Sequence, residues 1–282
     1  MARPLRIEFP DAVYHVTVRG NRKGVIFDDD NDRLFFLSLL QQTVERYNLV
    51  CHAYCLMGNH YHLLLETPDG NLSASMHYLN GNYAQAHNRR RGTVGHFFQG
   101  RFHAFLIEKD AYLLNVGRYT ILNPVRAGLV KRPREWKWSS YAATAGYVVC
   151  PSFLTTDFLL GCFSKDRTSA LRAYRQFVRE GMKVESPFLE AKPGAILGHQ
   201  MFVDWVWENV TRGSESLKEI TKTNRLVGRP TLRELFKGVF DKEHRYEMIR
   251  RAHVRCGYSL TDIAKHLSLS RIAISKIYHY KD

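Results

Sequence analysis

Two short segments hold residue types whose spacing suits metal binding and nucleophilic attack. In the first, His60 and His62 lie two residues apart in a strand-like segment, so their side chains share one face. In the second, Tyr119 comes four residues before Asn123 in a helix-like segment, and this spacing also places both side chains on one face. Two imidazoles and an oxygen ligand can hold a divalent metal ion, and a nearby tyrosine can attack a phosphodiester. This combination predicts nicking and joining of single-stranded DNA.

Each of these residues also has a simpler explanation. His60 and His62 could form a half-buried polar strand face, but the three leucines that follow predict a core strand, where unpartnered imidazoles are costly. Tyr119 is one of 15 tyrosines, and Asn123 before Pro124 could cap a helix. The joint spacing favours one site. Because an amide oxygen suits hard ions, we expect Mg²⁺ or Mn²⁺ on His60, His62 and Asn123.

The charge of the chain indicates the class of partner. The 41 Lys and Arg residues outnumber the 27 Asp and Glu residues, which gives a formal net charge of +14. Such an excess suits nucleic acid or an anionic membrane surface. No apolar run approaches the roughly 20 residues of a membrane span or resembles a signal peptide. We therefore expect nucleic acid as the partner, no membrane, and a cytoplasmic location, where the five cysteines stay reduced.

Basic residues gather in several segments that could contact DNA. One cluster follows the first expected strand, and another surrounds aromatic residues between 96 and 103 that could stack single-stranded bases. A solvated basic loop is the simpler alternative. The candidate DNA-binding residues are Arg19, Asn21, Arg22, Arg89, Arg90, Arg101, Arg126, Arg271 and Lys276.

The elements that must position these residues follow the order β-α-β-β-α-β-α. Hydrophobic periodicity predicts strands over 14–19, 49–57, 60–66 and 102–107. It predicts helices over 30–47, 71–88 and 110–122, the last one stopped by Pro124. The first six elements predict an α+β fold with a ferredoxin-like antiparallel sheet and helices on one face. The third helix must then return to the histidine strand.

The rest of the chain predicts a helical extension and a second DNA-binding element. We divide the chain into a catalytic domain over 1–145, closed by a Trp-rich segment, a helical extension over 146–240 and a helix-turn-helix over 241–282. Ser259 and Asp262 form a capping pattern before one short helix, and 271–280 predicts the next. Two short helices joined by a tight turn, the second one basic, are typical of a helix-turn-helix within an all-α C-terminal region.

Four segments of the chain, taken together, resemble a known family. They are Tyr-His-Val-Thr-Val-Arg-Gly-Asn at 14–21, Asn-His-Tyr-His-Leu-Leu at 59–64, Gly-His-Phe-Phe-Gln-Gly-Arg-Phe at 95–102, and Arg-Tyr-Thr-Ile-Leu-Asn-Pro-Val-Arg-Ala-Gly-Leu at 118–129. In this order and spacing they resemble the REP-associated tyrosine transposases, which are single-tyrosine members of the H-U-H nuclease superfamily. The resemblance covers residues 1 to about 145.

The resemblance implies a role for each matching residue. His60 and His62 match the metal-binding histidines, Tyr119 the nucleophile, and Asn123 the third metal ligand. The segment 19–21 matches a region that contacts a guide sequence beside a DNA hairpin. The resemblance thus implies metal-dependent cleavage and strand transfer at hairpin (REP-like) DNA with flanking single strand, through a 5′-phosphotyrosine intermediate. Relatives act as monomers or homodimers, and many lack the helix-turn-helix.

Two other functions stay open at the level of the sequence. The chain could be a DNA-binding regulator that uses the helix-turn-helix and keeps a retired catalytic scaffold, although the intact set of His60, His62, Tyr119 and Asn123 argues against this. It could also bind or process RNA, because a basic and aromatic surface does not separate RNA from DNA.

Overall fold

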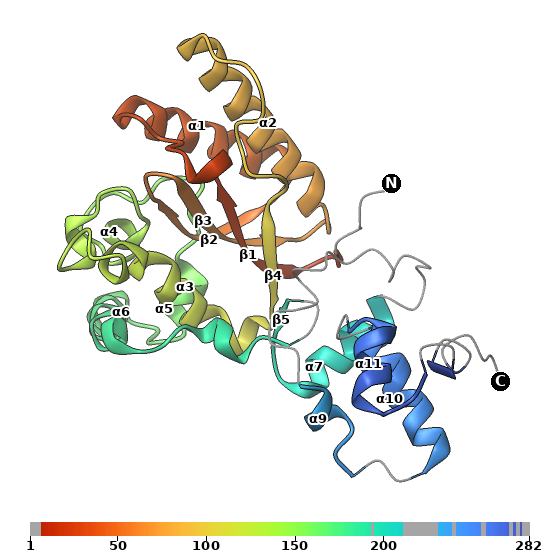
Figure 1. Cartoon of the computed structure of the whole chain (residues 1–282). Coiled ribbons are helices and arrows are strands. Elements are labelled where there is room, and N and C mark those ends of the chain that lie inside the picture. Colours follow the sequence, from red (N-terminus) through yellow and green to blue (C-terminus); the bar gives the residue numbers. More distant parts are fainter. Residues whose placement is uncertain are drawn as a thin grey trace. The chain divides into compact units, whose positions relative to one another are not determined.

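The computed structural model is a mixed α+β chain of two compact units (Figure 1). It describes residues 7–192, 195–210, 231–238, 241–254, 258–270, 273, 274 and 277. One unit is Glu8–Pro187, and the other combines Met1–Ile7 with Phe188–Asp282. The predicted division at 145 and 240 stays a prediction. No helix of the described part is long and apolar enough to cross a membrane.

An antiparallel sheet forms the centre of the first unit. Its strands are β1 (Ala12–Arg19), β2 (Val50–Leu56), β3 (His60–Thr67) and β4 (His103–Ile107), which lie in the order β2-β3-β1-β4. β3 pairs with both β1 and β2, and β1 also pairs with β4. The predicted strands and their antiparallel sheet are therefore confirmed, and the histidine strand is internal.

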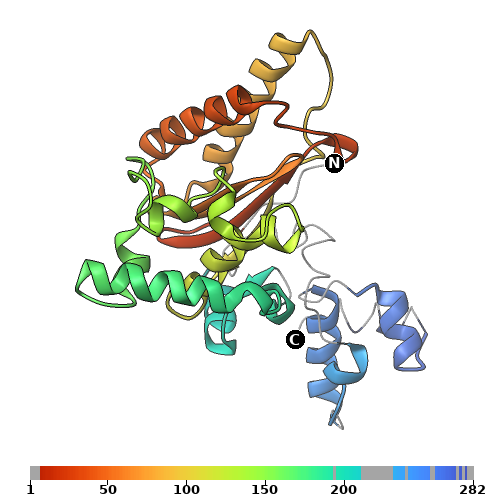
Figure 2. The ribbon, with the colours of Figure 1, turned by 90° about the vertical axis from the view of Figure 1, so that its left-hand side faces the viewer.

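Helices cover both faces of this sheet (Figure 2). The helices α1 (Asp30–Arg46) and α2 (Leu72–Arg91) lie on one face, and α3 (Lys109–Arg126) lies on the other. Tyr61 of β3 packs on Phe36 of α1, with ring centroids 4.6 Å apart, and donates a hydrogen bond of 2.6 Å to Asn80 of α2. Because strand side chains alternate, His60 and His62 face α3. The predicted return of the third helix is confirmed.

The helix α3 is longer than the sequence predicts. The expected end at Leu122 is wrong, because the helix continues through Pro124 to Arg126. Proline lacks an N–H group, so the carbonyl oxygen four residues earlier, on Thr120, loses its usual donor. The Asn123 Nδ2 atom donates to the Thr120 oxygen at 3.2 Å and to the Tyr119 oxygen at 2.9 Å. A side-chain amide thus replaces the missing backbone donor.

An ion pair attaches the start of α3 to the histidine strand. Lys109 Nζ lies 2.6 Å from Glu66 Oε1, and His52 Nε2 lies 2.8 Å from Glu66 Oε2. Further along α3, Gly117 lies over the Leu64 side chain of β3. These contacts set the position of α3 along β3, and therefore the position of Tyr119.

The segment that follows α3 closes the open edge of β2. The Leu56 N–H donates to the Trp138 oxygen at 2.9 Å, and the Ser140 N–H donates to the Tyr54 oxygen at 3.0 Å. The predicted packing of the Trp-rich segment on the sheet is thus confirmed. The elements after α3 in this unit are η2 (Pro133–Glu135), α4 (Tyr141–Thr144), α5 (Asp157–Gly161), α6 (Arg167–Glu180) and η3 (Gly181–Lys183).

The second unit contains mainly helices in its described part. A cluster of buried side chains, including Ile249, Ile263 and Ile274, forms its core. The Asp262 N–H donates to Ser259 Oγ at 3.0 Å, which confirms the predicted cap. Its elements are η4 (Pro187–Glu190), β5 (Ile196–Leu197), α7 (Gln200–Trp205), η5 (Val206–Val210), α9 (Leu232–Leu235), α10 (Lys242–Val254) and α11 (Leu260–His266).

The predicted helix-turn-helix is not confirmed. Of the expected last helix over 271–280, only residues 273, 274 and 277 are described. Arg271 and Lys276, two of the candidate DNA-binding residues, lie outside the described residues. The helix-turn-helix therefore stays a prediction.

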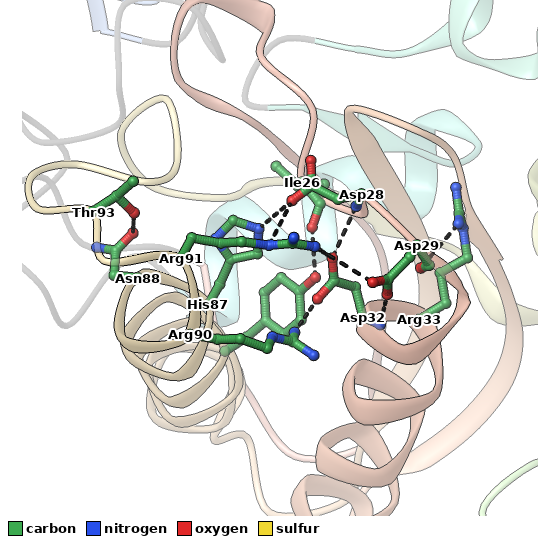
Figure 3. Close-up of polar contacts among 11 residues, drawn as sticks. Ile26, Asp28, Asp29, Asp32, Arg33, His87, Asn88, Arg90, Arg91 and Thr93 are labelled. Carbon is green, nitrogen blue, oxygen red and sulfur yellow. Dashed lines mark hydrogen bonds and ion pairs between the residues drawn. The ribbon is translucent and has the colours of Figure 1, made fainter.

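A charge cluster joins the start of α1 to the end of α2 (Figure 3). We name it the α1–α2 charge cluster; it comprises Asp28, Asp32, His87, Arg90 and Arg91. The fully buried Asp32 carboxylate pairs with Arg90 and, at 3.3 Å, with Arg91, and it accepts the Asp28 N–H at 2.9 Å. His87 Nε2 lies 2.9 Å from Asp28 Oδ2. The cluster thus fastens the two helices of one layer to each other.

The Glu66 contacts predict an acid-sensitive contribution to stability. Burial favours a raised pKa, but the hydrogen bonds and charges of His52 and Lys109 outweigh it and hold the pKa of Glu66 below its usual value. A lowered folded pKa adds stability above the unfolded pKa of about 4.3, and that stability is lost as the pH falls through the folded pKa. We expect Glu66→Gln to be less stable at pH 7 and to show a shallower loss of stability below about pH 4.3.

Urea unfolding between pH 3 and pH 7 measures this difference in the free energy of unfolding. Glu45→Gln is the matched control, because Glu45 is exposed on α1 and, among the described residues, accepts its hydrogen bond from Gln41 of the same helix. An unchanged pH dependence in Glu66→Gln would contradict the assignment.

The α1–α2 charge cluster predicts that its buried carboxylate contributes more to the free energy of unfolding than an exposed carboxylate does. We expect Asp32→Ala to lower the free energy of unfolding by about 1–3 kcal/mol, because it removes the buried carboxylate that Arg90, Arg91 and the Asp28 N–H share. Asp30→Ala, which removes an exposed ion pair with Lys137, should cost less than about 1 kcal/mol. Equal losses in the two variants, measured by urea unfolding, would show that burial does not set the effect.

Candidate active site

The structure brings three of the predicted residues to one place between β3 and α3. The His60 and His62 rings have centroids 5.0 Å apart and meet edge to face. The Tyr119 ring of α3 lies 6.3 Å from the His62 ring and is almost perpendicular to it. His62 is buried, whereas His60 and Tyr119 are partly accessible. A phosphate could therefore approach the open side of this group.

A fourth residue, His15 of β1, joins this group and was missed from the sequence. Its ring stacks on His62 with centroids 5.2 Å apart, and it meets the Tyr119 ring edge to face at 6.0 Å. Its Nε2 atom lies 3.2 Å from His62 Nδ1. Strand alternation was the available signal, because His15 shares a face with Arg19, and a split βαβ sheet places the first strand beside the histidine strand.

Burial keeps the three imidazoles neutral at ordinary pH. It lowers the pKa of His15 to about 3. It also lowers the pKa of His62, well below the usual value, with help from the positive forms of His15 and His60. Burial and the Arg19 guanidinium lower the pKa of His60. Neutral imidazole is the form that binds metal ions.

The donor set fits a divalent metal ion. His62 Nε2 is buried, and no hydrogen-bond partner for it exists in the described part of the chain. Because the Asn123 amide nitrogen donates to helix carbonyls, its oxygen is the side-chain atom left to act as a ligand. No hydrogen bond joins Asn123 to either histidine among the described residues. Asn123 as third ligand therefore stays a prediction.

Part of the α1–α2 charge cluster is a second candidate for a metal centre. Asp28, Asp32 and His87 have ligand atoms within 4.8 Å of one another. Arg90 and Arg91 pair with these carboxylates (Figure 3), so their negative charge is already compensated. This arrangement resembles a structural ion-pair network more than a metal site. It was not predicted from the sequence.

Arg126 lies beside Tyr119, the candidate catalytic tyrosine. Its guanidinium carbon sits 5.1 Å from the centre of the Tyr119 ring. The same guanidinium donates to the carbonyl oxygens of Val184 and Glu185, which follow η3 (Gly181–Lys183). Backbone from the extension thus holds a cation beside the tyrosine.

Three other candidate DNA-binding residues lie at the turn beside the histidines. Arg19, at the end of β1, pairs in register with His60 and is exposed. Asn21 and Arg22 are exposed in η1 (Asn21–Lys23). The Asn21 N–H donates to the Phe97 oxygen at 2.9 Å, so the aromatic segment adjoins this turn. The basic turn, the aromatic segment and the histidines therefore lie next to one another, where β1 ends and β3 begins.

The remaining candidates have different surroundings. Arg89 is exposed on the last turn of α2, and Arg101 is partly buried before β4. Arg90 is paired with the buried Asp32 carboxylate in the charge cluster. Its role in DNA binding, like that of the others, stays a prediction.

The chain is similar to one described family and to two known proteins. Residues 9–121 match the family described as Transposase IS200 like. A Haemophilus influenzae protein named as a REP-associated tyrosine transposase is 28% identical over 139 residues, which cover 45% of this chain and 77% of that protein. A solved REP-associated tyrosine transposase bound to a REP hairpin is 17% identical, with a TM-score of 0.46, and the match covers 55% of this chain and 92% of that chain.

The matched region contains all four strands of the first unit, His60, His62 and Tyr119. It ends at Ile121, so Asn123 and the extension lie beyond it. Residues 9–121 thus match the IS200-like transposase family, and the chain is similar to a REP-associated tyrosine transposase, which supports an enzyme that acts on DNA.

Proposed function

We propose that this protein nicks and rejoins single-stranded DNA beside hairpins of the REP type. The reaction is a metal-dependent transesterification at Tyr119 that passes through a 5′-phosphotyrosine intermediate. The observation that carries the proposal is the meeting of the Tyr119 ring with the His60–His62 pair on one sheet face. The likeness to a REP-associated tyrosine transposase supports DNA of the REP type as the substrate.

The histidines would hold the metal ion. His60, His62 and the Asn123 amide oxygen are the residues that we assign as ligands, and the ion is Mg²⁺ or Mn²⁺. When bound, such an ion polarises the scissile phosphate and stabilises charge on the departing oxygen. The buried His62 Nε2 atom supports this assignment, because a buried nitrogen without a partner is costly unless a ligand uses it.

Tyr119 acts as the nucleophile. Its hydroxyl oxygen forms a bond to phosphorus, and the bond from phosphorus to the 3′ oxygen of the preceding nucleotide breaks. The tyrosine proton ends on that oxygen, so the products are a 5′-phosphotyrosine and a free 3′-OH. A second 3′-OH can reverse the step and join a new strand. One phosphate ester replaces another, so the reaction needs no ATP.

Basic residues around the site would hold the DNA backbone. Arg126 places a cation beside the ring that carries the phosphate. Arg19, beside His60, and the exposed Arg22 are suited to bind the strand that enters the site. The aromatic segment, which the Phe97 carbonyl joins to this turn, is suited to stack an unpaired base. The further candidates for DNA binding are Asn21, Arg89, Arg90, Arg101, Arg271 and Lys276.

The nucleophile assignment predicts a separation of binding from cleavage. We expect Tyr119→Phe to lower cleavage of hairpin DNA by roughly a thousandfold or more, because the hydroxyl that forms the covalent link is removed. Binding of the same DNA should stay unchanged. Cleavage is measured on a denaturing gel with DNA taken from beside the gene, labelled at either end, with Mn²⁺ or Mg²⁺ or with EDTA.

The two labels separate the possible outcomes. A 3′ label should stay with the protein, whereas a 5′ label should leave on a fragment with a free 3′-OH. Tyr112→Phe is the matched control, since Tyr112 lies on the same helix two turns earlier. Full cleavage by Tyr119→Phe would disprove the nucleophile assignment. DNA binding with no cleavage in either metal would favour the regulator, and a preference for an RNA hairpin of the same sequence would favour an RNA function.

The metal assignment predicts different effects at two buried histidines. We expect His62→Ala to weaken Mn²⁺ binding by at least about tenfold, because a ligand is lost. His87→Ala is the matched control: His87 is equally buried and also has a ring nitrogen without a partner in the described residues. Isothermal titration of Mn²⁺ measures both affinities. A larger loss in His87→Ala would move the metal to the α1–α2 charge cluster.

A further inference from the structure

His15 has a defined place next to the proposed metal ligand. It lies on β1 opposite Leu64 of β3 and opposite Phe105 of β4. Because Thr17 is the residue opposite His62, His15 is its diagonal neighbour on the same sheet face. Only 2% of His15 is exposed, so water does not compete for the contact between the two rings.

The contact between the two rings allows only two proton arrangements. A hydrogen bond between two imidazole nitrogens needs one N–H and one lone pair, and each neutral ring supplies one of each. At the 3.2 Å contact between His62 Nδ1 and His15 Nε2, one ring donates and the other accepts. If His62 donates from Nδ1, its Nε2 atom keeps a lone pair. If His15 donates, the proton of His62 sits on Nε2 and blocks that atom.

The geometry selects the first arrangement for metal binding. A histidine that binds a metal through one ring nitrogen normally donates its other N–H to a neighbouring acceptor, which sets its tautomer and ring plane. His62 Nε2 is the nitrogen without a partner in the described part of the chain, and His15 Nε2 is the acceptor available at Nδ1. His15 Nε2 is taken up by its contact with His62 Nδ1, so we assign His15 as a partner of His62 and not as a third ligand.

His15 also contacts the nucleophile candidate. Its ring meets the Tyr119 ring edge to face at 6.0 Å, while His62 meets the same ring at 6.3 Å. A change in the orientation of His15 would therefore disturb both the ligand and the tyrosine.

We propose that His15 is a positioning residue, which accepts the His62 Nδ1–H and thereby keeps His62 Nε2 ready to bind the metal ion, while its ring supports Tyr119. This inference rests on the proposed function. It concerns the metal-free protein as well, because the tautomer of His62 is set before any ion binds.

Substitutions at His15 can separate the acceptor from the volume of the ring. His15→Gln places an amide oxygen near the former Nε2 position, whereas His15→Phe keeps a ring but has no acceptor. We expect His15→Phe to weaken Mn²⁺ binding about 10- to 100-fold and His15→Gln to weaken it less than about threefold. Val16→Ala is the control for damage to β1, because Val16 is fully buried on the opposite face. His15→Asn, whose amide is too short to reach His62, replaces the phenylalanine variant if that one does not fold.

A second measurement does not depend on metal. Long-range ¹H–¹⁵N spectra of the metal-free protein report which nitrogen of His62 carries the proton. We expect the Nδ1–H form in the wild type and in His15→Gln, and a shift towards the Nε2–H form in His15→Phe. Val16→Ala should keep the Nδ1–H form even where it lowers the melting temperature.

The outcomes distinguish this inference from the proposed function. Equal Mn²⁺ affinities of wild type and His62→Ala would remove the metal site itself, and the spectra would still test the tautomer. If His62→Ala weakens binding but His15→Phe binds Mn²⁺ like the wild type with an unchanged tautomer, His15 has no positioning role. Equal weakening in His15→Gln and His15→Phe would also overturn the proposal, because the acceptor would then be irrelevant.

Discussion

Helix α3 can serve the site only if its position along β3 is fixed. A slip of one residue would turn each side chain by about 100° and carry Tyr119 away from the histidines. The Glu66–Lys109 ion pair holds the start of the helix, and His62 meets Tyr119 more than two turns later. The strand that carries the histidines and the helix that carries Tyr119 are therefore joined through contacts that lie outside the candidate site.

The site gathers groups that a stable core would avoid. Three imidazoles share one sheet face, and two of them are almost completely buried. Burial keeps them neutral, and His62 Nε2 gains no partner in the described chain. A buried polar atom of this kind costs about 1–3 kcal/mol. A ligand bound to His62 Nε2 would offset that free-energy cost. The set of donor atoms is therefore stronger support for a metal site than the composition of the chain.

The net charge of +14 overstates the charge that is available to DNA. Arg90 and Arg91 neutralise carboxylates within the α1–α2 charge cluster, and Arg126 is held by backbone carbonyls beside Tyr119. Arg19 and Arg22 are exposed at the turn beside His60. Position relative to the site therefore says more about DNA binding than the number of basic residues.

The sequence by itself determined the features that depend on the repeat of a single strand or helix. Alternation placed His60 and His62 on one face, helical spacing linked Tyr119 to Asn123, and the order of elements predicted the sheet. Only the tertiary structure decided that His15 joins the histidines, that Arg90 turns to Asp32, and that α3 continues through Pro124. The reason is physical: strand and helix periods act between near neighbours, whereas ring stacking, ion pairs and the rescue of a lost donor depend on side-chain packing.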